Sequence, residues 1–133
     1  MDARVSLEAD LSAPYRARRW LSALQMPLAP SRADEAELLV AELVTAAVKH
    51  AMSDGVRSID VELHAEDGVV HLDVTDPARR VRPQVPEEPD EVTGFGFYLV
   101  DKIADRWGVT GGDSPGLWFE LDIYQLPDAP VVV

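Results

Sequence analysis

Cysteine is absent from the 133-residue sequence, and long apolar runs are absent as well. The first absence excludes a disulfide framework, a cysteine nucleophile and thiolate metal sites, and it is consistent with a reducing compartment. The second excludes a membrane helix, which needs roughly 18 apolar residues. The N-terminal segment also lacks the apolar core of a signal peptide. We therefore expect a cytoplasmic protein that does not enter the membrane.

Basic residues are scarce relative to acidic ones. Lys and Arg number 12 against 24 Asp and Glu, which gives a net charge of -12. Because neutralisation of phosphates supplies most of the affinity for nucleic acid, this charge argues against direct binding to DNA or RNA. A net charge of this sign favours binding to a basic protein surface, or binding of a ligand in a locally basic pocket. The one basic cluster, RARR at residues 16–19, is interpreted as the solvated face of a helix.

The length and composition predict one domain. A chain of this size can bury roughly 70% of the surface that its unfolded form exposes, which is enough for a hydrophobic core. We place the domain at residues 1–126 and a tail at residues 127–133.

The first part of the chain predicts a strand and a short helix. Apolar and polar residues alternate within residues 4–11, which indicates a strand. Ser12 is suited to an N-cap and Pro14 to a first helical turn. A helix should therefore follow and run to about Leu24.

A longer helix is predicted between residues 31 and 51. Ser31 and Asp34 have the spacing of a capping box. Apolar residues then recur at helical spacing, namely Ala36, Leu39, Leu43, Ala47 and Ala51. Gly55 is the expected turn residue that ends this helix.

Two alternating runs at residues 57–65 and 69–76 predict a hairpin around a turn at Asp67 and Gly68. This register gives the pairs Leu63–Leu72, Val61–Val74, His64–His71 and Glu62–Asp73. Two facing histidines can grip a metal ion, but no third ligand is evident, so a polar sheet face is the simpler interpretation. The Glu62–Asp73 pair indicates either a solvated face or one that meets a basic partner.

The second half of the chain predicts a long loop, a helix and a second hairpin. Residues 77–93 carry four prolines and no apolar period, and a loop of this length often serves as a lid. A glycine pair then opens a helix in which Leu99, Ile103 and Trp107 are spaced for packing. The closing hairpin spans residues 107–124, and its inward face is formed by Leu117, Phe119, Leu121 and Ile123.

The resulting order is strand, two helices, two strands, loop, helix and two strands. Because hairpins join most neighbouring strands, the sheet should be mixed or mostly antiparallel. We therefore predict an α+β fold, a two-layer α/β sandwich with helices over one face of the sheet.

Three features stand in the order that an ATP site requires. Glu42 is a carboxylate on the long helix, Asp76 ends a strand, and Gly94 and Gly96 precede a helix. Helix N-terminal N–H groups can bind phosphate oxygens, and an aspartate can accept a hydrogen bond from an adenine amino group. Each feature also has a structural interpretation: a solvent-facing helix residue, a strand-end turn, and a tight turn.

Four segments carry a resemblance to a known family. They read ELVTAAVKHA at 42–51, VTDPARR at 74–80, GFGFYLVDKIADRWGV at 94–109 and GLWFEL at 116–121. Their order resembles the Bergerat-type ATP-binding fold of the histidine-kinase/Hsp90/gyrase superfamily. More narrowly, the chain looks like the small stand-alone branch of anti-sigma-factor serine kinases. The resemblance covers nearly the whole chain.

The resemblance implies a role for each matching residue. Glu42 corresponds to the presumed catalytic base, which takes the proton of a partner's serine hydroxyl as that oxygen attacks the γ-phosphate. Asp76 corresponds to the adenine-binding aspartate, and Gly94 and Gly96 to the glycines beside the phosphates.

Further positions on the long helix and after the aspartate belong to the implied ATP site. Thr45 and His50 match the family's helix, and Ala46 and Ala78 occupy positions that face the nucleotide in the family. The resemblance thus implies ATP as the cofactor.

Three departures from the family pattern affect catalysis. Ala46 replaces the asparagine whose oxygen helps to hold Mg²⁺, so the sequence argues against a tightly held Mg²⁺ and supplies no metal ligand there. Phe95 replaces an arginine between the two glycines. Pro77 and Ala78 stand where glycines often follow the aspartate. The helix keeps its shape with Ala46, so the fold survives while the chemistry is compromised.

The favoured interpretation is an anti-sigma-factor-like regulatory protein with weak or lost phosphotransfer, in effect a pseudokinase. It would act in transcription regulation by binding a sigma factor or an anti-sigma antagonist, and the family also implies a possible homodimer. The alternative is an active ATP-dependent serine/threonine kinase that phosphorylates the antagonist. An unrelated α/β domain and a detached histidine-kinase domain are the remaining interpretations.

Overall fold

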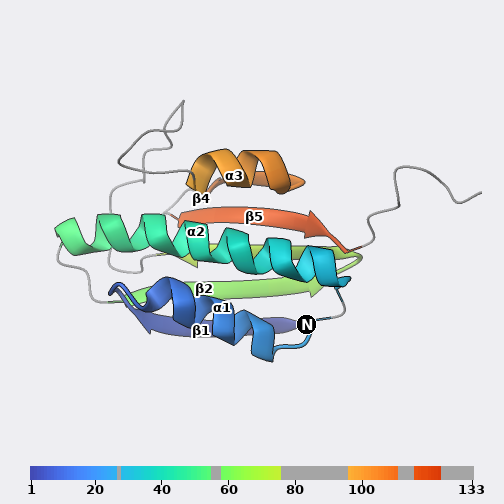
Figure 1. Cartoon of the computed structure of the whole chain (residues 1–133), viewed down its shortest axis with the longest axis horizontal. Helices are drawn as coiled ribbons and strands as arrows, with labels where there is room; N and C mark the ends of the chain where they lie inside the picture. The colour runs from blue at the N-terminus through green and yellow to red at the C-terminus, as the bar shows by residue number, and fades with distance from the viewer. Residues whose placement is uncertain (27, 55–57, 76–95, 111–115, 124–133) are drawn as a thin grey trace, which may run out of the picture.

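Three helices lie over one face of a five-stranded sheet in the described part of the chain (Figure 1). The computed structural model describes residues 1–26, 28–54, 58–75, 96–110 and 116–123. The strands are β1 (Asp2–Glu8), β2 (Ser58–Glu66), β3 (Val69–Thr75), β4 (Arg106–Thr110) and β5 (Gly116–Asp122). The helices are α1 (Ala13–Ala23), α2 (Pro30–Asp54) and α3 (Gly96–Ile103). Their order along the chain is the predicted one.

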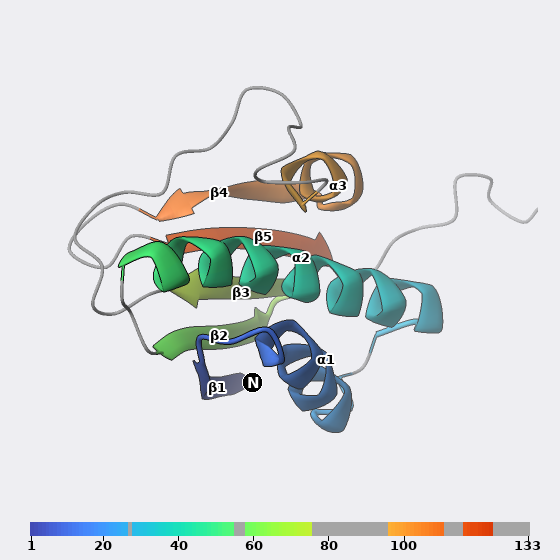
Figure 2. The same ribbon diagram turned by 60° about the vertical axis from the view of Figure 1, so that its left-hand side comes forward.

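The sheet has the strand order β1-β2-β3-β5-β4, and every described pairing is antiparallel. Figure 2 shows all three helices on the same side of this sheet. The predicted α+β sandwich with helices over one face is therefore confirmed.

The β2–β3 hairpin forms in the predicted register. Asp67 and Gly68 make its two-residue turn with φ values of 54° and 79°, and a turn with two positive φ values fits the right-handed twist of a hairpin. The predicted pairs Leu63–Leu72, Val61–Val74, His64–His71 and Glu62–Asp73 are all present.

The core lies between the sheet and the helices. Every second residue of β2, β3 and β5 points toward α2, and the largest fully buried side chain is Phe119. The predicted inward residues Leu117, Phe119 and Leu121 are buried, whereas Ile123 is partly exposed. Helix α2 contributes Ala36, Leu39, Val40, Leu43, Val44, Ala46 and Val48 to this core.

The predicted N-cap Ser12 is confirmed in position, whereas the predicted cap Ser31 is wrong. Ser12 directly precedes α1, but it has a helical backbone and its side chain makes no capping hydrogen bond; its hydroxyl and its N–H both donate to Asp10 Oδ1, at 2.5 and 2.8 Å. Helix α2 begins at Pro30, so Ser31 lies inside the first turn rather than before it. A proline at the first helical position loses only an N–H that has no helical partner.

The expectation that Trp107 continues the third helix is also wrong. Helix α3 ends at Ile103, and the Asp105 N–H donates to the Glu120 carbonyl, which turns the chain into the sheet. Trp107 therefore lies in β4 beside Phe119, and its Nε1–H donates to Asp101 Oδ1 at 3.0 Å.

Two further predictions concern segments outside the described residues. The loop at residues 77–93 is one, and the boundary between the domain and the tail at residue 126 is the other. Of the described helices, none has the length and apolar character that crossing a membrane requires.

Candidate functional site

Helix α2 places Glu42 and Ala46 one turn apart, so both side chains lie along the same side of the helix. Glu42 is half-buried, and no described residue forms a hydrogen bond or an ion pair with its carboxylate. Ala46 is only 4% exposed and belongs to the core cluster. The position next to the carboxylate is thus filled by a buried methyl group.

Two other predicted residues also lie on α2. The Thr45 hydroxyl donates to the Ala41 carbonyl at 2.7 Å, a bond to the preceding turn that commits its proton to the helix backbone. Its oxygen retains acceptor capacity. His50 lies in the last turns of α2, and its side chain is outside the described residues.

The N-terminus of α3 begins at Gly96, as the glycine pair predicted. Helix α3 packs against α2, and its Val100 side chain is fully buried. The first N–H groups of a helix have no partner within the helix and attract anions. Asp76, Ala78 and Gly94 lie outside the described residues, so their position beside Glu42 stays a prediction.

A comparison with family models connects this arrangement to known proteins. Residues 7–118 match the model of the histidine kinase-like ATPase domain. The chain belongs to this family. The match runs from β1 into β5 and includes every predicted site residue. No curated protein matches the chain.

In this histidine kinase-like ATPase domain, a buried arginine of α2 forms an ion pair with an aspartate of the segment after α3. Arg32 in the first turn of α2 is 3% exposed, and it donates to Glu35 at 2.7 Å and to Asp105 at 3.0 Å. The Asp105 carboxylate also accepts the Asp122 N–H at 2.8 Å. The Arg32–Asp105 ion pair therefore connects α2 to the segment after α3, and the Asp122 N–H hydrogen bond connects that segment to the end of β5.

Sequence reasoning missed this ion-pair cluster, although a signal was present. Arg32 precedes Ala36 by four residues and therefore lies on the apolar stripe of α2. A charged residue on such a stripe needs a buried partner, and Asp105 supplies it from a position 73 residues away.

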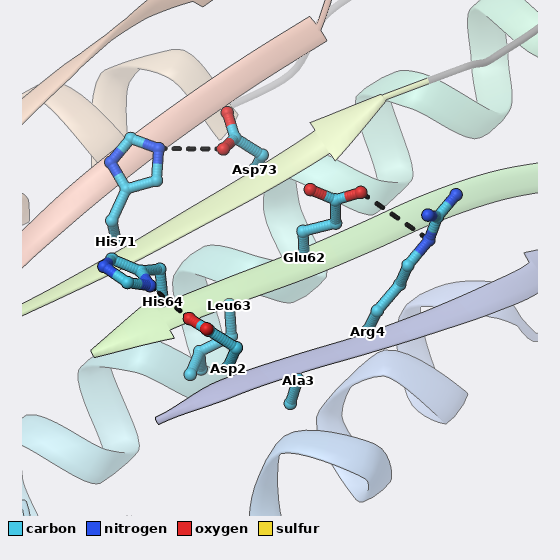
Figure 3. A pocket seen from close by; sticks show the side chains of 8 residues that line it. All are labelled: Asp2, Ala3, Arg4, Glu62, Leu63, His64, His71 and Asp73. Carbon is cyan, nitrogen blue, oxygen red and sulfur yellow. Dashed lines mark hydrogen bonds and ion pairs between the residues drawn. The ribbon is translucent and has the colours of Figure 1, made fainter. Parts of the chain in front are cut away.

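The far face of the sheet contains a hollow of about 420 Å³ (Figure 3). Its polar lining consists of Asp2, Arg4, Glu62, His64, His71 and Asp73. These side chains stand on the opposite side of the sheet from the helices, and therefore from Glu42 and Ala46 on α2.

Each histidine of the predicted pair lies between two carboxylates. His64 contacts Asp2 and Glu66, and His71 contacts Glu120 at 2.9 Å and Asp73 at 2.8 Å. Asp2 and Glu66 accept hydrogen bonds from the imidazole, which raises the pKa of His64 above its usual value. Among the described residues, no three side chains are arranged to hold a metal ion.

Proposed function

We propose that the chain is an anti-sigma-factor-like regulatory protein that has lost most or all of its phosphoryl transfer and acts by holding a partner protein. Membership of the histidine kinase-like ATPase family supports a nucleotide-binding ancestry. The observation that carries the proposal is Ala46, a buried methyl group one turn beyond Glu42.

The physical reason lies in how enzymes transfer phosphoryl groups. Catalysis there depends on positioning the phosphates and on neutralising their charge with Mg²⁺. An alanine side chain has no ligand atom, so Mg²⁺ loses its main protein ligand and depends more on water and on phosphate oxygens. The fold tolerates Ala46 because alanine favours the helix and packs in the core.

The alternative is an active serine/threonine kinase. Glu42 favours it, because a partly exposed carboxylate without a described partner is suited to accept a proton from a partner's hydroxyl. In that function, Asp76 would bind adenine, and Gly96 at the start of α3 would present N–H groups to the phosphates.

Calorimetric titration of the wild-type protein with ATP and ADP, in Mg²⁺ and in EDTA, separates the two functions. We expect weak nucleotide binding whose dissociation constant changes by less than about twofold with Mg²⁺, because Ala46 offers the metal no ligand atom at the position of the family's asparagine. Micromolar ATP binding that tightens about tenfold or more with Mg²⁺ would refute the loss of metal coordination and favour the active kinase.

A further inference from the structure

The sheet face opposite the helices carries many charged side chains from the described strands. No described helix covers it (Figure 2). Alternation along the five strands brings many carboxylates to this face, namely Asp2, Glu8, Asp60, Glu62, Glu66, Asp73, Glu120 and Asp122. We call this surface the outer face.

The arginines of the outer face are each shared between two of its carboxylates. Arg4 pairs with Asp60 at 2.8 Å and Glu62 at 3.6 Å. Arg106 pairs with Glu120 at 2.7 Å and also with Asp122. Eight described carboxylates therefore stand against two arginines, and the outer face is negative.

Several carboxylates of the outer face are exposed to solvent and accessible to a partner. The side chain of Glu62 is 52% exposed in the middle of the face, and that of Glu66 is 64% exposed at one end of β2. The hollow of about 420 Å³ is lined by Glu62 and by residues of β1, β2 and β3, so the surface is not flat. A basic side chain can thus reach several carboxylates at once.

An aromatic pair adds a specific feature to the outer face. The rings of Trp118 and His71 stack with centroids 5.2 Å apart. Gly108 on β4 leaves the space that the indole occupies, because a Cβ at this position would lie only 2.9 Å from a carbon of the Trp118 ring. Asp73 lies directly opposite Trp118, and Glu120 opposite His71. A lysine or arginine is attracted both to a tryptophan ring and to adjacent carboxylates.

We propose that the outer face binds a basic segment of a partner protein, with a lysine or arginine of that segment beside Trp118. Complementary charge steers such an encounter and excludes acidic partners. A second copy of this chain, packed face to face, would bring like charges together. This binding is independent of the proposed ATP site, which lies on the helix side of the sheet.

The test uses ¹⁵N-labelled full-length protein and the peptide acetyl-(GKR)₄-amide in 0.15 M salt. We expect shifts of the Trp118 indole resonance and of backbone amides in β2, β3 and β5, with weaker binding at higher salt. The Trp118→Phe variant assigns the indole signal among the three tryptophans of the chain. The control peptide acetyl-(GER)₄-amide, with no net charge, should cause no such shifts.

Two variants with the same change in net charge locate the site. Glu62→Lys/Glu66→Lys on the outer face should weaken the peptide's dissociation constant about tenfold or more. Asp34→Lys/Glu37→Lys on α2 should change it by less than about twofold, because charges beyond about 8 Å are screened in this salt. Glu62→Gln/Glu66→Gln should also weaken binding, and this variant replaces the lysine variant in the test if the lysine variant does not fold.

Several results would overturn the proposal. Equal weakening by both lysine pairs would show attraction to net charge alone. Amide shifts confined to the helices, or no binding in 0.15 M salt, would exclude the outer face. Sedimentation velocity that shows a dimer broken by Glu62→Lys/Glu66→Lys would assign the face to a second copy instead.

Discussion

Replacement of Ala46 by asparagine is expected to create Mg²⁺-dependent ATP binding and to destabilise the unliganded protein. Ala46 is 4% exposed, so the new amide would be buried in the core without a designed partner. Burial of an amide without hydrogen bonds costs about 1–3 kcal/mol in proteins. Asparagine also favours a helix less than alanine does.

Bound Mg²⁺ and ATP should restore stability to the Ala46→Asn variant. The amide oxygen then coordinates the metal, and a ligand at about 100 times its dissociation constant stabilises the folded state by about 2.7 kcal/mol. Urea unfolding of the variant with and without Mg²⁺ and ATP measures both effects, and calorimetry measures the dissociation constant.

Ala41→Asn is the matched control for this variant. Ala41 lies on the same helix but is partly exposed and outside the core cluster, so its amide can reach water. We expect a small loss of stability and no gain in ATP binding. If Ala46→Asn gains no Mg²⁺-dependent binding, the loss of the metal ligand at this position is not what distinguishes the chain from an active kinase.

The second large effect concerns the ion pair between Arg32 and Asp105. Asp105→Ala should lower the free energy of unfolding by about 2–3 kcal/mol, because it leaves part of a buried guanidinium unpaired. This expected loss of stability is smaller than that for a fully buried ion pair, because the Asp105 side chain is 27% exposed. The variant also removes the acceptor of the Asp122 N–H. Urea unfolding measures the change.

Two further variants distinguish this explanation from a general effect of charge. Asp34→Ala on the exposed side of α2 should change stability by less than about 0.5 kcal/mol. The double variant Arg32→Met/Asp105→Ala should be more stable than Asp105→Ala, because it removes the unpaired charge. Equal or lower stability of the double variant would contradict a dominant role for the ion pair.

Local rules were sufficient to predict the hairpins. Alternation fixed which residues of β2 and β3 share a face, and the Asp67–Gly68 turn fixed the register, so His64 and His71 were correctly paired. The same alternation located the buried residues of β5. The pairings of β1 with β2 and of β3 with β5 join distant segments, and no local signal in the sequence predicted either of them.

Interactions between distant residues were the part that local rules missed. The Ser12 hydroxyl donates to Asp10 Oδ1, and its oxygen makes no capping hydrogen bond with α1. After α3, the Asp105 N–H donates to the Glu120 carbonyl, and the Asp105 carboxylate pairs with Arg32, a residue far away in the sequence. The site was predicted from the family pattern. Of its residues, the structure describes the α2 positions and Gly96, while Asp76, Ala78 and Gly94 lie outside the described ranges.

ATP hydrolysis in the presence of Mg²⁺, in which water accepts the γ-phosphoryl group in place of a partner's serine and ADP and phosphate are released, tests the lost phosphoryl transfer most directly. The wild-type protein should be compared with Glu42→Gln, which keeps the shape of the side chain and removes the base. We predict equal, near-background rates, because removal of a proton from the attacking water gives little acceleration when the γ-phosphate is not held in position for attack. A wild-type rate about 100-fold above that of Glu42→Gln, the effect of a working general base, would contradict the account.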